Sequence, residues 1–412
     1  MEGLARVIAT MQIQHASQIS PRLVSPIAGR CKAIAMEMAQ QLPQNQIAHA
    51  EAARTMAAEL SLIASSVRFL EFPSSSAWTS GVEHPAIAVL SAAWPMLEEI
   101  VSAKMWQAPS VVKAISEIYV AALLSAKANS VTMVVPMLEA ISRIFTATGY
   151  PSILEPIGTA VEMVSFSSEN GASELLPNAP HVAAALTAAF AQVAHETTRL
   201  ASADPTSPET WERAEALFVA ARALVVFAPA HGLSNEALFP TLDLAIAALE
   251  LREYPPVRAS LALLNILIAP GEKSKASPPW VANAARVDEF FTTRGAKIVA
   301  VVFNSACAER MPRPAIRAGA TLIATLLHTA PTAVFPWIND ALVASSLSAE
   351  PTDAAARADD DVARPRLLAA LSPARLPALL PKPRCVSAIC DYILIRQRVG
   401  DVDDLLAYDV DG

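Results

Sequence analysis

The residues best suited to bind a metal ion form incomplete patterns. His195 and Glu196 begin like the His-Glu-x-x-His motif, which binds zinc through two histidines one helical turn apart, but Arg199 stands where the second histidine is required. Cys385 and Cys390 are five residues apart, which places them on different faces of a helix and favours two buried thiols. We therefore expect no metal site from either pattern.

Patterns typical of catalysis are equally incomplete. The run Asp359–Asp361 lacks the glycine turn and the following glutamate of an EF-hand, so we predict a solvated acidic loop. No glycine-rich phosphate-binding motif and no GxSxG motif occurs. His84 precedes a proline and is expected to start a helix, whereas His328 lies among leucines and is expected in the core or at its boundary. The sequence predicts that the protein is not an enzyme, with no catalytic residue, no cofactor and no metal ligand.

The composition indicates many helices. The 412 residues are 53% hydrophobic, yet they include only 12 glycines against 31 prolines. Scarce glycine disfavours β-hairpins, and abundant alanine and leucine punctuated by proline is typical of helices with abrupt ends. The formal net charge of −8 argues against direct binding of nucleic acid, because phosphates require clustered lysine and arginine.

A positive mean hydropathy of +0.37 raises the question of membrane spans. The longest run without a charged residue, Ala318–Asn339, contains His328, Pro331 and Pro336, and the other apolar runs are shorter than the roughly 20 residues that a span needs. We therefore predict a soluble protein without membrane insertion. No secretory signal is visible, and four cysteines in so long a chain indicate free thiols in a reducing compartment.

Apolar residues recur with helical periodicity along the chain, and the breaks fall at regular intervals. Between residues 208 and 227, for example, Trp211, Ala214 and Phe218 share one face, while Glu212 and Arg213 lie off it. The predicted helices span residues 22–42, 46–69, 84–102, 110–127, 131–149, 151–166, 181–203, 208–227, 233–250, 255–269, 279–292, 294–311, 313–329, 332–347, 364–378 and 384–399.

Most of these helices are apolar over much of their circumference, so each must pack against a neighbour on both sides. Helix pairs joined by short, proline-containing loops cannot bury such faces alone, whereas a stack of pairs can. We therefore predict an all-α, HEAT/armadillo-type helical-repeat solenoid, that is, an α-α superhelix. The alternative is an irregular α-helical bundle. In the solenoid, the second helices of successive pairs would form a concave surface that grips a partner.

The chain is expected to divide into three parts. Residues 1–348 are predicted to form the HEAT-like helical repeats, 349–366 an acidic low-complexity linker, and 367–412 a terminal helical segment and tail. Within the repeats, stretches rich in serine, glycine, asparagine or proline are predicted to be loops, namely residues 73–82, 166–180 and 271–279.

Six segments carry a family resemblance. They are Gly3–Ala9, His84–Ile100, Val134–Ile157, Glu209–Pro229, Gly295–Leu342 and, as a weaker echo of a closing helix, Cys385–Val399. In their patterns and their order, these segments resemble the C-terminal half of an importin-β-type nuclear transport receptor (karyopherin-β), in the transportin-SR and importin 13 branch.

The resemblance implies a HEAT-repeat receptor that carries a cargo protein through nuclear pores, binds nucleoporins and releases its cargo on binding the GTP-loaded Ran GTPase. Such a receptor shuttles between cytoplasm and nucleus. The family's Ran-binding repeats lie in an N-terminal half that this chain lacks, so the sequence resembles a fragment.

In the branch that imports SR proteins, an arginine-rich helix holds phosphorylated RS domains. The corresponding stretch here, Pro109–Lys127, offers only Lys113 and Lys127, so we do not expect it to bind phosphorylated RS cargo.

Two functions stay open on the sequence alone. We favour a fragment of a nuclear transport receptor that binds cargo and nucleoporins for protein import into the nucleus. The alternative is a generic HEAT-repeat scaffold for protein interactions outside nuclear transport. Neither hypothesis assigns cargo-binding residues. An in-frame receptor domain encoded upstream of Met1 would favour the first, and a stop codon there would favour the second.

Overall fold

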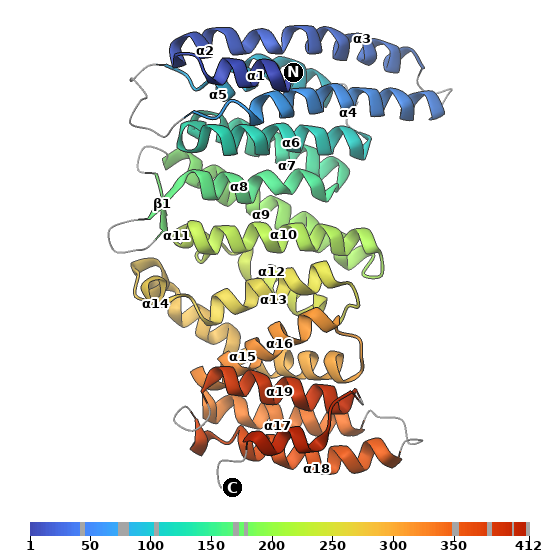
Figure 1. Ribbon diagram of the computed structural model, residues 1–412, viewed down its shortest axis with the longest axis vertical. Coiled ribbons are helices and arrows are strands. Elements are labelled where there is room, and N and C mark those ends of the chain that lie inside the picture. The colour runs from blue at the N-terminus through green and yellow to red at the C-terminus, as the bar shows by residue number, and fades with distance from the viewer. Residues whose placement is uncertain are drawn as a thin grey trace. The chain divides into compact units, whose positions relative to one another are not determined.

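The protein is represented by a computed structural model (Figure 1). The chain forms two compact units. The first unit comprises Met1–Glu169, Ser173–Arg199 and Val226–Asn235, and the second comprises Asn170–Ala172, Leu200–Val225 and Glu236–Gly412. The structure describes residues 1–41, 46–72, 82–102, 107–167, 173–176, 180–347, 354–376, 381–397 and 399–408.

Nearly all regular elements are helices. In chain order the α-helices are α1 (Glu2–Ala9), α2 (Ile13–Ile19), α3 (Ser25–Gln41), α4 (Gln46–Arg68), α5 (Pro85–Ser102), α6 (Pro109–Ala126), α7 (Val131–Thr148), α8 (Glu155–Met163), α9 (Pro180–Ala203), α10 (Pro208–Phe227), α11 (Pro229–Gly232), α12 (Leu238–Ala248), α13 (Tyr254–Ile268), α14 (Glu272–Lys275), α15 (Pro278–Cys307), α16 (Arg313–Thr329), α17 (Pro331–Leu347), α18 (Ala354–Ala370) and α19 (Lys382–Arg396). Short 3₁₀ turns span Ser20–Leu23, Lys127–Ser130, Pro151–Leu154, Pro373–Arg375 and Val402–Tyr408. Strands β1 (Ser165–Ser167) and β2 (Ser173–Leu175) form an antiparallel pair in which Phe166 lies opposite Glu174.

Alternate helices pack directly on one another within each unit. In unit 1, α6 contacts both α4 and α8, and these second helices of successive pairs lie in the front layer of Figure 1, with α5, α7 and α9 behind them. In unit 2, α16 contacts α13 and α19, while α15 contacts α17. Each unit is thus a stack of helices in which one layer is formed by helices that are not consecutive in the chain, α4, α6 and α8 in unit 1 and α13, α16 and α19 in unit 2. This arrangement confirms the prediction of an all-α, HEAT/armadillo-type helical-repeat fold.

Helix α6 shows why the helices need neighbours on both sides. Its apolar residues are buried around most of its circumference, and it packs against α4, α5 and α8. Tyr119, which is 1% exposed, stacks on the ring of Trp94 from α5 with the ring centroids 5.8 Å apart. A helix that is apolar on all sides is stable only when it is enclosed, so stacking is the means by which α6 is stabilised.

Proline stands at the start of many helices, as the sequence predicts. Helix α10 begins at Pro208, directly after Ser207. At the start of α5, His84 accepts a hydrogen bond at Nδ1 from the backbone N–H of Ala86, with a donor–acceptor distance of 3.1 Å. This confirms that His84 starts a helix. Helix α7 ends at Gly149, whose φ of 67° lies in the left-handed region that favours glycine.

Residues 278–307 form one helix, α15, where the periodicity predicts two helices, 279–292 and 294–311. The helix continues through the predicted boundary at residue 293, and Gly295, just after that boundary, has a packing role. A methyl group added to its Cα would overlap the ring of Trp337 on α17. Glycine therefore lets α15 and α17 approach closely, which outweighs its poor helix propensity.

Replacing Gly295 with alanine is expected to destabilise unit 2 by about 1–3 kcal/mol, because the added methyl forces the Trp337 ring to move in a packed interface. The same substitution at Gly29, in α3, meets nothing within 4 Å and should stabilise its helix by up to about 1 kcal/mol. Urea denaturation of both variants measures the change in the free energy of unfolding, which should be negative for Gly295→Ala and positive for Gly29→Ala. A stabilised Gly295→Ala protein would contradict the close packing.

The described part of the predicted linker 349–366 is helical. Residues 348–353 lie outside the described part of the chain, but α18 begins at Ala354 and continues to Ala370. It packs against α19, so the segments expected on either side of the linker belong to the same unit. The alanine-rich sequence of α18 has a high helix propensity. Asp360 of α18 is buried against the neighbouring helix, as described below.

The predicted loops also differ in part. Residues 73–81 of the first lie outside the described residues. The second, 166–180, contains most of the β1–β2 pair, and the backbone N–H of Leu176 donates to the carbonyl of Val164 at 2.9 Å. The third, 271–279, includes the four-residue helix α14 and the start of α15. Helices α1 and α2 precede the first helix that the periodicity predicts.

Candidate protein-binding groove

An open groove of about 670 Å³ crosses the layer of first helices in unit 1. Its lining comes from three helices that are far apart in the sequence, α5, α7 and α9. The lining residues are Glu98, Leu138, Glu139, Ser142, Arg143, Ala185, Ala188, Ala189 and Gln192. The sequence predicts a binding surface on the second helices, whereas this groove lies on the layer of first helices.

Small side chains on α9 create the hollow. Ala185, Ala188, Ala189 and Gln192 follow one another at intervals that place them on one face of the helix, opposite α7. Three alanines there leave the space that longer side chains would fill. Leu138 of α7, which is 1% exposed, contributes apolar surface beside them. The floor of the groove is therefore apolar and shallow.

Charged side chains stand at the side of the groove that α5 and α7 form. Arg143 donates through Nη2 to Oε1 of Glu98 at 2.7 Å, and this pair joins α7 to α5. Glu139 lies one helical turn before Arg143 and is exposed. Two carboxylates and one guanidinium thus line the groove, and its local charge is negative.

Ser142 supplies a buried polar group to the same groove. The residue is only 6% exposed, and its Oγ has no hydrogen-bond partner among the described residues. A serine inside a helix commonly donates to the carbonyl four residues earlier, but Ser142 Oγ makes no such bond. An unpartnered buried hydroxyl costs free energy that a bound polar group would recover.

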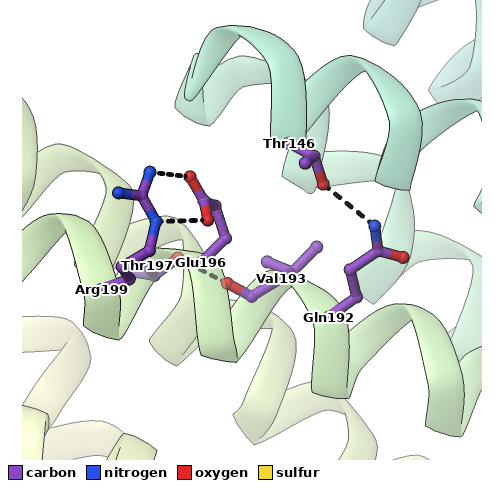
Figure 2. Close-up of polar contacts among 6 residues, drawn as sticks. All are labelled: Thr146, Gln192, Val193, Glu196, Thr197 and Arg199. Atoms are coloured by element: carbon purple, nitrogen blue, oxygen red, sulfur yellow. Dashed lines mark hydrogen bonds and ion pairs between the residues drawn. The ribbon is translucent and has the colours of Figure 1, made fainter.

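Polar contacts tie α7 to α9 at one end of the groove (Figure 2). Gln192 donates through Nε2 to Oγ1 of Thr146 at 3.0 Å. One turn further along α9, Arg199 donates to both carboxylate oxygens of Glu196, at 2.9 and 2.6 Å. Arg199, which interrupts the zinc motif, therefore pairs with the glutamate of that motif.

The remaining residues singled out from the sequence lie apart from the groove. Cys385 is buried, and burial raises the pKa of its thiol to about 12, while burial also raises the pKa of Cys390. Both thiols are thus protonated at neutral pH and poorly nucleophilic.

His328 is half-buried, with Nδ1 2.8 Å from the carbonyl oxygen of Ala324, which agrees with a boundary position. Among the described residues, no three His, Cys, Asp or Glu side chains lie together as metal ligands would.

The aspartate run is not the solvated loop that we expected, since it lies in α18. Asp360 is 3% exposed and pairs with Arg396 of α19, with 2.8 Å between Oδ2 and Nη1. Tyr392 donates its hydroxyl to Oδ1 of Asp360 at 2.7 Å, and burial raises the pKa of that phenol. A charge is buried at low cost when both of its oxygens are paired. This cluster holds α18 to α19 and has no access to a ligand.

One stretch of the described residues, Pro109–Thr148, is long and apolar enough to cross a membrane by length and composition, and half of its most apolar window is buried. It comprises α6 and α7, between which Lys127 adopts a φ of 50°. The charge-free run Ala318–Asn339 is divided between α16 and α17. Because a buried core helix meets the same criterion, the absence of membrane insertion stays a prediction.

The groove residues were not predicted from the sequence. Alanines are common throughout the chain, so those at 185, 188 and 189 do not stand out. The one usable signal is that small side chains share a face of α9 beside a polar residue, Gln192. The matching residues of α5 and α7 are more than 40 positions away, and only the packing of the helices identifies them.

The fold is similar to that of a solved structure of importin 13 described as its cytosolic state. The two chains share 14% sequence identity with a TM-score of 0.69, and the match covers 95% of this chain. It covers 40% of the importin 13 chain, so this chain spans less than half the length of that protein. No family model matches the chain, and no curated protein matches its sequence.

This likeness defines the class of fold, an all-α helical-repeat protein of the HEAT/armadillo type. At 14% identity it does not extend to the branch of the family or to the C-terminal position that the sequence resemblance implies. The groove gives this fold a shallow surface with an apolar floor.

Proposed function

We propose that this chain is the protein-binding part of a nuclear transport receptor of the importin-β kind. It binds cargo protein and nucleoporins for protein import into the nucleus, and it shuttles between cytoplasm and nucleus. It works by binding and catalyses no reaction. Release of cargo by GTP-loaded Ran is proposed for repeats outside this chain, since the similar importin 13 chain is more than twice as long as the matched part.

The observation that carries this proposal is the similarity to importin 13 over 95% of the chain. The groove on α5, α7 and α9 supports it, because a shallow surface with an apolar floor and charged edges suits a polypeptide. Stacked helical repeats present long surfaces of this kind, and such proteins commonly bind other proteins.

Docking at nuclear pores in permeabilised cells tests the proposal. The full 412-residue chain, fused to a fluorescent protein, is expected to accumulate at the nuclear rim. Excess unlabelled importin β should reduce that accumulation by competing for nucleoporins, and the fluorescent protein alone is the control. A fusion that distributes like the control, with no rim signal, would contradict a role in nuclear transport.

A generic HEAT-repeat scaffold outside nuclear transport is the second candidate. It is favoured by the low identity to importin 13 and by the lack of any matching family model. The two candidate functions predict different results for the nuclear-pore experiment, but both are compatible with protein binding in the groove. A chain that fails to reach the nuclear rim but still binds a protein partner through α7 and α9 would support the generic scaffold.

A further inference from the structure

We infer that the groove on α5, α7 and α9 binds a short extended segment of a partner protein through a lysine or arginine side chain. This inference rests on the proposed function in so far as the chain is a protein-binding scaffold. It adds the chemical nature of the bound segment, which neither the fold nor the likeness to importin 13 specifies.

The dimensions of the groove suit an extended chain. Ala185 and Gln192, which mark its length along α9, are seven residues apart, and at about 1.5 Å per residue this is about 10 Å. An extended chain rises about 3.3 Å per residue, so about three residues match this length. A helix is about 10–12 Å across with its side chains and would rest on the edges of so short a hollow.

The hydrogen-bonding groups of the lining are mainly acceptors. The donors of the lining are partly used, because Arg143 donates to Glu98 and the Gln192 amide donates to Thr146. The Glu139 carboxylate makes no hydrogen bond or ion pair with any described residue, and Ser142 Oγ has no partner either. A ligand that brings donors, such as a backbone N–H and a cationic side chain, would satisfy both groups.

The charged residues of the lining also favour a lysine or arginine side chain as the ligand. The lining holds two glutamates and one arginine, and the arginine lies between both carboxylates, paired with Glu98 and one turn from Glu139. An incoming phosphate would meet the two carboxylates and would have to displace Glu98 from Arg143. A lysine or arginine side chain would instead gain Glu139 as a partner. The alanine floor leaves room for the apolar stem of such a side chain.

Fluorescence anisotropy with labelled nine-residue peptides tests the inference on the full chain. The probe is an alanine- and glycine-rich peptide with two central lysines. The comparison peptides carry alanine or phosphoserine at those two positions. We expect the lysine peptide to bind, the alanine peptide to bind about tenfold more weakly, and the phosphoserine peptide not to bind. The affinity of the lysine peptide should fall as salt is raised, because its partners are exposed charges.

Paired variants locate the binding site. Ala188→Leu fills the floor and should weaken binding of the lysine peptide about tenfold. Ala33→Leu, at an exposed alanine of α3 outside the lining, should leave it unchanged. Glu139→Gln should weaken binding to a similar extent, and Glu162→Gln, an exposed glutamate of α8, is its control. Ser142→Ala should weaken binding less, because only one neutral hydrogen bond is lost.

Several outcomes would overturn the inference. These are no binding of the lysine peptide up to about 1 mM, equal binding of the alanine peptide, tighter binding of the phosphoserine peptide, or equal effects of Ala188→Leu and Ala33→Leu. A chain that docks at nuclear pores but fails these tests keeps the proposed function and loses the inference. A chain that passes them but does not dock loses only the role in nuclear transport.

Discussion

Replacing Asp360 with alanine is expected to destabilise unit 2 by about 3–5 kcal/mol. The substitution leaves Arg396, whose side chain is 12% exposed, without its 2.8 Å partner, and it removes the acceptor of the Tyr392 hydroxyl. An uncompensated buried charge is among the most costly defects in a core. Hydrogen exchange of the α18 and α19 amides, measured by mass spectrometry, gives the change in opening free energy directly.

Two further variants separate this cause from a general effect on α18. Asp359→Ala changes the exposed neighbour and should alter stability by less than about 0.5 kcal/mol. The double variant Asp360→Leu with Arg396→Met removes both charges and should recover most of the loss, because apolar groups replace a buried pair at little cost. Equal exchange in Asp360→Ala and Asp359→Ala would show that α18 is held by something other than the ion pair.

The stability of α5 is expected to fall as the pH is lowered from about 6.5 to about 4. Burial lowers the pKa of His84 from 6.5 to about 4. Between these pH values the unfolded chain binds a proton that the folded protein does not bind. The free energy of unfolding therefore decreases as the pH falls. The loss reaches about 3 kcal/mol near pH 4, at about 1.4 kcal/mol per pKa unit. Protonation of Nδ1 also removes the acceptor for the N–H of Ala86.

His84→Asn provides the comparison for this pH dependence. Asparagine is a good helix cap and does not titrate, so the variant keeps an acceptor at the start of α5. The difference in opening free energy between the variant and the parent protein, followed at the α5 amides, should shift by about 3 kcal/mol in favour of the variant between pH 7 and pH 4. His181→Asn, at an exposed position of α9, controls for the substitution itself. A difference that stays constant with pH would contradict burial of a neutral His84.

Much of the fold could be predicted because the local signals are strong. Ser207 and Pro208 fix the start of α10, and the apolar periodicity between residues 313 and 329 gives both ends of α16. Such signals depend only on neighbouring residues. The need to stack helices follows from their apolar circumference, as α6 shows, and this is why the fold class could be predicted as well.

The errors arise where a distant residue decides the outcome. The periodicity predicts a boundary between two helices at residue 293, but α15 runs through it, and Gly295 packs closely against Trp337, more than 40 residues later. The aspartates of α18 read as a solvated linker, because nothing local announces that Arg396 and Tyr392 will pair with Asp360. The groove is a third case, since its lining joins Glu98, Ser142 and Ala188 from three helices.

The central claim, that this scaffold holds a protein segment in the groove on α5, α7 and α9, is tested most directly by site-specific photo-crosslinking. A photoreactive amino acid is placed at position 188 or, as the control, at position 33 of the full chain, an exposed alanine of α3, and cross-links to the lysine peptide are mapped by mass spectrometry. We predict a cross-link from position 188 to residues next to the lysines and none from position 33. Equal cross-linking from both positions, or none from position 188 while the peptide is bound, would contradict the account.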